Sequence, residues 1–99
     1  MKEIFIECRS FVSRADLHKG IAAAMAFPEW YGNNLDALHD QLTSIGEQTV
    51  IRLSHWAEAE AAMGRYSLCA RRAMEDAQKW NPNIKIVFEF DFLFMSKKK

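Results

Sequence analysis

The chain has 99 residues, of which 49% are hydrophobic and 26% are charged, a composition typical of a folded globular protein. This length predicts a single domain over residues 1–99, because the chain is too short to divide into two hydrophobic cores. Thirteen basic and thirteen acidic side chains balance to a net charge of zero, so composition gives no indication of a nucleic-acid-binding surface.

The sequence also carries no sign of export or of a membrane segment. No apolar run approaches the roughly 20 residues that a membrane helix needs, and Glu3 and Glu7 interrupt the stretch where a signal peptide would be apolar. Cys8 and Cys69 are far apart and match no metal-ligand spacing. We expect both to be reduced, buried thiols in a cytoplasmic protein.

The N-terminal part predicts one strand and one helix. Apolar side chains alternate with their neighbours over residues 3–8, which is the period of a β-strand. Ser13, followed three residues later by Asp16, resembles the capping box at the start of a helix. That helix must end before Pro28, and its apolar face consists of Leu17, Ile21, Ala24 and Met25.

The middle of the chain predicts a second helix and a second strand. Asn33 or Asn34 can cap the N-terminus of this helix, and Gly46 can close its C-terminus. β-branched residues then favour a short strand over 49–53. The apolar stripe of the helix consists of Leu35, Leu38, Leu42 and Ile45.

The second half predicts two more helices and a last strand. Ser54 can cap a third helix that ends at Gly64, and Ser67 can open a fourth that reaches about Trp80. Strand alternation then resumes, with one face made of Ile84, Ile86, Phe88, Phe90, Phe92 and Phe94.

The predicted order is therefore βααβααβ, with helical crossovers between consecutive strands. This order favours an α/β fold in which a three-stranded parallel sheet packs with four helices. The last strand is unusually long. Its end, Phe88–Phe94, can pair with a partner or a second copy, or can cover the core, and we favour core cover with Lys97–Lys99 as gatekeepers against aggregation.

Charge is distributed unevenly along this framework. Between Lys19 and Arg52 there is no Lys or Arg, and the charged residues in that interval are all acidic: Glu29, Asp36, Asp40 and Glu47. The zero net charge therefore hides a region of about a third of the chain that is purely acidic.

The second helix carries two of these acids on one arc. At 100° per residue, the arc that lies away from the leucine stripe consists of Asp36, His39, Asp40 and Thr43. Asp36 and Asp40 form an i, i+4 pair of like charges, which costs an isolated helix about 0.2–0.5 kcal/mol. Such a local cost indicates either a functional face or a plain solvated face, and the residues alone leave these two interpretations about even.

The loop before this helix is the second candidate for a functional element. Trp30 and Tyr31 are residue types enriched at interface hot spots, and Gly32 can adopt a positive φ. Aromatic residues in the loops of small proteins also commonly fold back onto the core, so packing is the alternative interpretation for both.

Residues 16–18 read DLH and residues 27–43 read FPEWYGNNLDALHDQLT. These segments resemble the signature of the barstar family, whose namesake inhibits a bacterial guanyl-specific ribonuclease. The resemblance implies an intracellular proteinaceous inhibitor that blocks a ribonuclease active site stoichiometrically with an acidic helix and its preceding loop. It implies a protein partner, with no direct binding to nucleic acid or to membranes.

The resemblance also implies roles for individual residues. Asp40 matches the central carboxylate that takes the place of an RNA phosphate, and Asp36 matches the second acidic contact. Asp76, on the fourth helix, falls where the family has a peripheral acidic contact. The positions that match the surroundings of the central contact are Trp30, Gly32, Asn34, Thr43 and Glu47.

Three positions depart from the family pattern. A Trp is replaced by His39, a Cys by Gln41, and another aromatic residue by Ile45. We include His39 among the partner-binding residues, since it can add a pH-dependent charge beside the two carboxylates. The zero net charge also contrasts with the acidic total expected of the family. These departures affect the identity of the target more than the mode of binding.

Other functions stay open at this point. Asp36, His39 and Asp40 share a face and could be metal ligands or an acid–base set, but His18 and His55 belong to other segments, so we expect no enzyme, metal or cofactor. The chain could be a bacterial immunity protein, or antitoxin, against a toxin unlike barnase, or an adaptor that inhibits nothing. A monomer is favoured, with a dimer through the last strand as the alternative.

Overall fold

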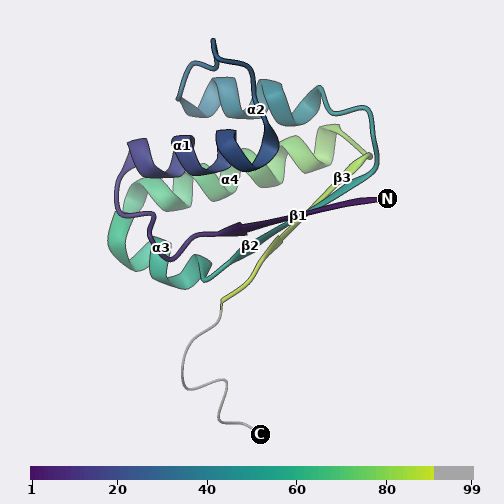
Figure 1. Ribbon diagram of the computed structural model, residues 1–99. Helices are drawn as coiled ribbons and strands as arrows, with labels where there is room; N and C mark the ends of the chain where they lie inside the picture. The colour runs from purple at the N-terminus through teal and green to yellow at the C-terminus, as the bar shows by residue number, and fades with distance from the viewer. Residues whose placement is uncertain (91–99) are drawn as a thin grey trace, which may run out of the picture.

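The computed structural model describes residues 1–90, in the element order βααβααβ (Figure 1). The strands form one parallel sheet in the order β1-β2-β3: β1 (Lys2–Glu7), β2 (Thr49–Ser54) and β3 (Ile84–Phe88). The helices are α1 (Arg14–Met25), α2 (Leu35–Thr43), α3 (Trp56–Met63) and α4 (Arg65–Trp80). The predicted α/β fold class, with three parallel strands and four helices, is confirmed.

The sheet buries one face against the helices. In Figure 1, α1, α2 and α4 lie on one side of the sheet. The residues at the buried face include Ile6, Ile51, Leu53 and Ile84, each at most 4% exposed. On the other face, Phe5 is 65% exposed, and the Arg52 guanidinium lies 3.3 Å from the carboxylates of both Glu3 and Glu89. This two-sided alternation is what a sheet covered on one face requires.

The predicted start of α1 is confirmed. The Ser13 side-chain oxygen accepts a hydrogen bond from the Asp16 backbone N–H at 3.2 Å, and the Asp16 carboxylate accepts one from the Val12 N–H at 3.1 Å. The helix ends at Met25, as expected from the proline that follows. The prediction that Ala24 belongs to the buried face is wrong, because the face turned to the core is formed by Leu17, His18 and Ile21.

The prediction that Gly46 closes the second helix is wrong. The helix ends at Thr43, and a side chain distant in the sequence donates hydrogen bonds to carbonyls near this end. The Asn81 amide donates to the carbonyl oxygens of Leu42 and Ile45, both at 2.9 Å. These bonds satisfy one carbonyl of the last helical turn and one just beyond it without a glycine cap.

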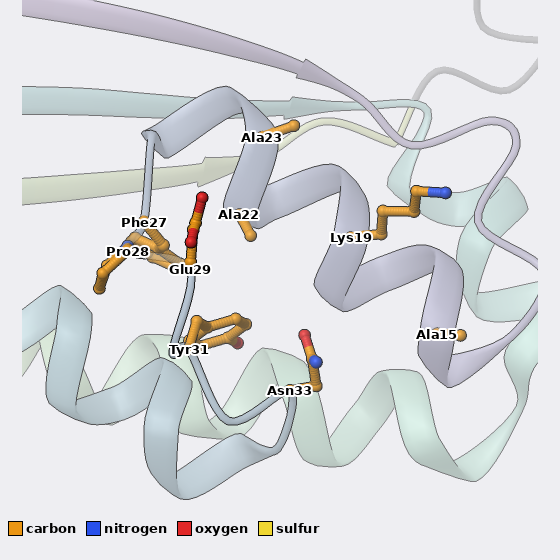
Figure 2. Close-up of a pocket in the computed structure, with 9 residues that line it drawn as sticks. All are labelled: Ala15, Lys19, Ala22, Ala23, Phe27, Pro28, Glu29, Tyr31 and Asn33. Atoms are coloured by element: carbon orange, nitrogen blue, oxygen red, sulfur yellow. The ribbon is translucent and has the colours of Figure 1, made fainter.

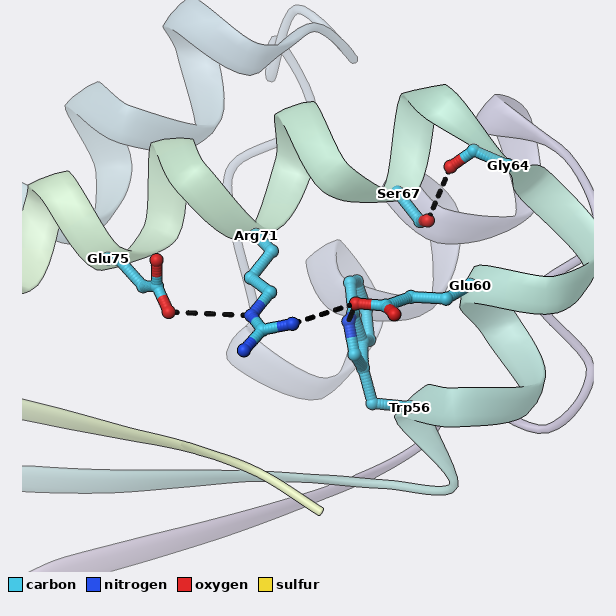
Figure 3. A network of polar contacts seen from close by, with 6 residues as sticks. All are labelled: Trp56, Glu60, Gly64, Ser67, Arg71 and Glu75. Carbon is cyan, nitrogen blue, oxygen red and sulfur yellow. Dashed lines mark hydrogen bonds and ion pairs between the residues drawn. The ribbon is translucent and has the colours of Figure 1, made fainter. Parts of the chain in front are cut away.

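The two serines predicted to start α3 and α4 have other roles. Ser54 remains in β2, where it pairs with β1, and the residue before α3 is His55, at φ 58°. The fourth helix begins at Arg65, because Gly64, with φ 63°, makes the break between the helices. Ser67 is buried in the first turn of α4, and its hydroxyl donates to the Gly64 carbonyl at 2.6 Å (Figure 3).

Polar contacts join α3 to α4 beneath this break (Figure 3). The Glu60 carboxylate accepts from the Trp56 indole at 2.7 Å and from the Arg71 guanidinium at 3.1 Å. Arg71 also lies 3.4 Å from the Glu75 carboxylate. Because Trp56 is fully buried, its N–H needs such a partner, and Glu60 supplies it.

The last strand is shorter than predicted. It ends at Phe88, although Phe90 still packs partly buried against the core. The Arg71 guanidinium lies 5.5 Å and 5.0 Å from the ring centroids of Phe88 and Phe90. These contacts agree with core cover as the role of Phe88 and Phe90, whereas Phe92 and Phe94 lie outside the described residues.

The two cysteines have different environments. Cys8 is buried as predicted, and burial together with the neighbouring Glu7 charge raises the pKa of its thiol to about 12. Cys69 is exposed on α4, so the prediction that it is buried is wrong. Within residues 1–90, none of the helices is long and apolar enough to cross a membrane.

Candidate partner-binding site

The buried stripe of α2 determines which of its side chains face outward. Leu38 and Leu42 are 0% and 1% exposed, and the helix packs against α4. Leu38 and Leu42 of the predicted apolar stripe are therefore confirmed as buried, whereas Leu35 and Ile45 are only partly buried against the core, and Ile45 lies beyond the end of the helix. Asp36 and Asp40 are both exposed on the remaining surface. We call the set Asp36, His39, Asp40 and Thr43 the acidic face.

The two carboxylates of the acidic face have no counter-ion within the described part of the chain. Over residues 1–90, no Lys, Arg or His nitrogen lies within 4 Å of the carboxylate of Asp36 or of Asp40. The acidic residues Glu3, Glu60 and Glu89, by contrast, each contact an arginine. The acidic face thus keeps two unpaired negative charges on a rigid helix.

The hydroxyl proton of Thr43 is already donated in hydrogen bonds within α2. Its Oγ1 donates to the carbonyl oxygens of His39 and Asp40, at 2.9 Å and 3.1 Å. The hydroxyl oxygen can therefore still accept a hydrogen bond from outside, but it has no free proton to donate.

The start of α2 is set by Asn34, which settles the choice between the two asparagines. Its side-chain oxygen accepts from the Ala37 N–H at 2.7 Å, and its side-chain nitrogen donates to the Gly32 carbonyl at 3.2 Å. The positive φ predicted at Gly32 is wrong, since Asn33 adopts it, at 55°. Space is restricted at Gly32 instead: a Cβ there would lie 3.1 Å from the Asn34 side-chain nitrogen, in tight contact with the capping side chain.

The two loop aromatics separate into one exposed and one buried residue. Trp30 is 77% exposed, whereas Tyr31 is 6% exposed and its ring centroid lies 4.9 Å from that of Phe27. The Tyr31 hydroxyl lies 2.7 Å from His18 Nδ1, and burial raises its pKa to about 12. Tyr31 is therefore a packing residue, and Trp30 is the aromatic residue of the loop that is open to a partner.

Asp76 lies directly beside the acidic face. His39 Nε2 is 2.8 Å from Asp76 Oδ2, which joins α2 to α4 at the surface. A groove of about 380 Å³ runs between the two helices and is lined by Leu35, Asp36, His39, Cys69, Arg72, Ala73 and Asp76. Sequence reasoning missed Cys69 and Arg72, although their spacing of seven and four residues before Asp76 places all three on one helix face.

Comparison with known proteins places the sequence in a family. Residues 1–92 match the family described as Barstar, the barnase inhibitor. The chain belongs to the barstar family. It is also 30% identical over 91 residues to YrdF of Bacillus subtilis strain 168, which is named as a candidate ribonuclease inhibitor. That match covers 90% of this chain and 100% of YrdF, and it confirms the family resemblance seen in the sequence.

His39 and Glu47 differ in how they relate to the acidic face. The imidazole is about one-third exposed and is held by Asp76, so it joins the acidic face to the groove. Glu47, in contrast, lies in the loop after α2, where its carboxylate is 3.9 Å from the Lys2 ammonium. No hydrogen bond or ion pair within the described residues connects Glu47 to the acidic face.

A second groove of this barstar-family chain lies on the other side of the loop, against α1 (Figure 2). It has a volume of about 510 Å³, and Lys19 and Glu29 are on its two walls. Tyr31 projects into this region from the loop (Figure 2). In the part of the chain that the structure describes, no group of three or more His, Cys, Asp or Glu side chains is placed to hold a metal ion.

Proposed function

We propose that this chain is a stoichiometric inhibitor that blocks the active site of a ribonuclease with α2 and the loop before it. Membership of the barstar family and the similarity to YrdF support the role of ribonuclease inhibitor. The observation that carries the proposed mechanism is the pair of exposed carboxylates, Asp36 and Asp40, that have no counter-ion within residues 1–90.

The chemistry of the target explains why such a pair inhibits. A ribonuclease gathers cationic groups around the phosphate it cleaves, and these donors remain in place when no substrate is bound. Asp40 takes the position of the phosphate, and Asp36 binds a neighbouring cation. Because α2 is rigid before binding, holding the carboxylates in place costs little additional ordering entropy.

The loop and α4 extend this contact. Trp30 packs its exposed ring on the enzyme, while Asn34 and Gly32 hold the loop in shape at the start of α2. Further polar contacts come from residues around the carboxylates: His39, Thr43, Glu47 and Asp76. We propose that Glu47 exchanges its long 3.9 Å contact with Lys2 for a cation of the enzyme.

The proposed setting is the cytoplasm of a bacterium, where such a protein protects the cell from a ribonuclease. Two free cysteines, one of them exposed, fit a reducing compartment. The partner is the enzyme itself, with no direct contact to nucleic acid or to a membrane, and the chain performs no catalysis.

The test is a titration of RNA cleavage by a guanyl-specific ribonuclease of the barnase type. We expect the wild type to abolish cleavage at one inhibitor per enzyme. Asp40→Ala should weaken inhibition by roughly thirty-fold or more, which corresponds to a hot-spot loss of about 2 kcal/mol. Glu58→Ala is the matched control, because Glu58 is an exposed helix carboxylate on α3 that should not contact the enzyme.

Titrations against this and other ribonucleases also distinguish two alternative functions, an immunity protein with a different target and an adaptor that inhibits nothing. A folded wild type that fails against this enzyme but inhibits another ribonuclease toxin would be an immunity protein with a different target. A protein that inhibits no ribonuclease would be an adaptor, and the proposed function would be wrong.

A further inference from the structure

His18 is a buried histidine placed between two tyrosine hydroxyls. Its Nδ1 lies 2.7 Å from the Tyr31 hydroxyl and its Nε2 lies 2.6 Å from the Tyr66 hydroxyl. The side chain is 1% exposed, and both ring nitrogens are within hydrogen-bonding distance. The three rings form a continuous polar chain that runs from the buried Tyr31 through His18 to the partly buried Tyr66.

This chain joins three separate parts of the fold. His18 is in the middle of α1, Tyr31 is in the loop between α1 and α2, and Tyr66 is in the first turn of α4. Tyr31 is the loop residue directly after the exposed Trp30 and directly before Gly32. The backbone of the proposed binding loop is therefore attached to α1 and α4 through one imidazole.

We propose that His18 is a positioning residue for the partner-binding loop: its bonds to Tyr31 and Tyr66 hold residues 27–34 in the shape that presents Trp30 and the start of α2. The inference rests on the proposed function, because it assigns the loop to the binding surface. It adds a residue that does not touch the partner.

The chemistry of the three side chains fixes how this works. Burial, and then the charge of Arg14, lower the pKa of His18, so the imidazole is neutral at neutral pH and has one N–H donor and one acceptor nitrogen. One tyrosine hydroxyl therefore donates to the ring and the other accepts from it. The groups around this chain that titrate or carry charge are Arg14 on α1, whose guanidinium lies 4.8 Å from the Tyr66 ring centroid, the Cys69 thiol on α4 near Tyr66, and the two tyrosines themselves.

Acid changes this hydrogen-bonding pattern by protonating the acceptor nitrogen of His18. Protonation adds an N–H to the acceptor nitrogen, so the tyrosine that donated to it must turn its proton away. The positive charge would also lie close to Arg14. We therefore expect the loop to loosen as His18 is protonated.

The experiment compares His18→Gln with His18→Met. The two replacements have the same length, but only the glutamine amide donates and accepts hydrogen bonds. Amide hydrogen exchange of residues 27–34 is measured in the free protein, and inhibition of the ribonuclease is measured in parallel. We expect His18→Met to speed exchange in the loop and to weaken inhibition, each by about tenfold, and His18→Gln to stay within about threefold of the wild type.

A pH series adds a second test, because a purely structural role of His18 would not make loop exchange depend on pH. Loop exchange of the wild type, relative to the intrinsic rate, should rise as pH falls through the lowered pKa of His18, and that of His18→Gln should not. Equal behaviour of the Gln and Met variants, or an unchanged loop in a folded Met variant, would overturn the proposal. If neither variant folds, Tyr66→Phe replaces them, and an unchanged loop in that variant overturns the proposal equally.

The two measurements keep this inference separate from the proposed function. A loop that loosens in His18→Met while the wild type inhibits no ribonuclease would contradict the proposed function and support the positioning role. If the wild type inhibits the ribonuclease but loop exchange is the same in the wild type and in His18→Met, the proposed function is supported and the positioning role of His18 is contradicted.

Discussion

The Nε2 atom of His39 lies 2.8 Å from the Oδ2 atom of Asp76, across the boundary between α2 and α4. The contact extends the acidic face of α2 onto a second helix, and it brings together residues that are 37 positions apart. Both side chains are partly exposed, so the pair is expected to add little to stability. Its role is to fix the orientation of the imidazole beside the two unpaired carboxylates.

Asp76→Asn tests this division between stability and binding. The substitution removes one charge from a partly exposed pair, so the free energy of unfolding should change by less than about 1 kcal/mol. Association with the ribonuclease should slow more than dissociation changes, as expected for a charge at the edge of an interface. Urea denaturation and stopped-flow binding measure the two effects.

Glu75→Gln is the control for Asp76→Asn, since Glu75 is the preceding residue of α4 but contacts Arg71 instead. Its association rate should match that of the wild type. A loss of more than about 2 kcal/mol in folding stability for Asp76→Asn would contradict the view that the pair is a surface contact.

A substitution on the buried face of α2 should lower stability and should not act through the binding surface. Leu38 is fully buried, so Leu38→Ala should lower the free energy of unfolding by about 2–5 kcal/mol and leave the chemistry of the acidic face unchanged. Leu68→Ala is the matched control, because Leu68 is 52% exposed on α4 and should lose less than about 0.5 kcal/mol. Equal losses in the two variants would show that the apolar stripe of α2 is not core.

The fold and much of the acidic face could be predicted because they depend on local periods. The alternation of strand residues and the spacing of Leu38 and Leu42 are present in the sequence and do not depend on tertiary contacts. The outward direction of Asp36 and Asp40 follows from the same helical spacing, and the structure places both there.

The features that were missed depend on residues distant in the chain. Asn81 donates to carbonyls at and just beyond the end of α2 from 39 and 36 residues away, and no local pattern contains that information. Serine is common both in strands and at helix caps, so Ser54 could not be assigned from its neighbours alone. The role of His18 depends on its hydrogen bonds to Tyr31 and Tyr66, which are 13 and 48 residues away in the sequence.

The unpaired charges of the acidic face should make binding sensitive to salt. Raising ionic strength screens long-range attraction between exposed charges, so the association rate should fall steeply while the dissociation rate changes little. Asp36→Asn should flatten this dependence, because it removes one of the two carboxylates that attract the enzyme. Binding kinetics between about 0.01 and 0.5 M salt measure both slopes. An association rate of the wild type that does not depend on salt would contradict the electrostatic part of the mechanism.

The buried imidazole of His18 predicts that mild acid weakens the fold. Burial and Arg14 hold its pKa below the usual value of 6.5 in the folded protein, whereas the unfolded chain has the usual value. Between these two values the unfolded state binds more protons, so the free energy of unfolding rises with pH. The stabilisation is therefore fully present above about pH 6.5 and is lost as pH falls through the folded-state pKa.

Urea denaturation of the wild type and of His18→Gln between about pH 5 and pH 7.5 isolates this contribution, since most carboxylates stay ionised over that range. The slope of the wild type should exceed that of the variant by at most one proton, or about 1.4 kcal/mol per pH unit. Glutamine does not titrate, so any slope that it retains belongs to other groups. Parallel curves would mean that His18 binds a proton equally well in the folded and unfolded chains, and they would contradict the neutral, hydrogen-bonded imidazole on which the loop depends.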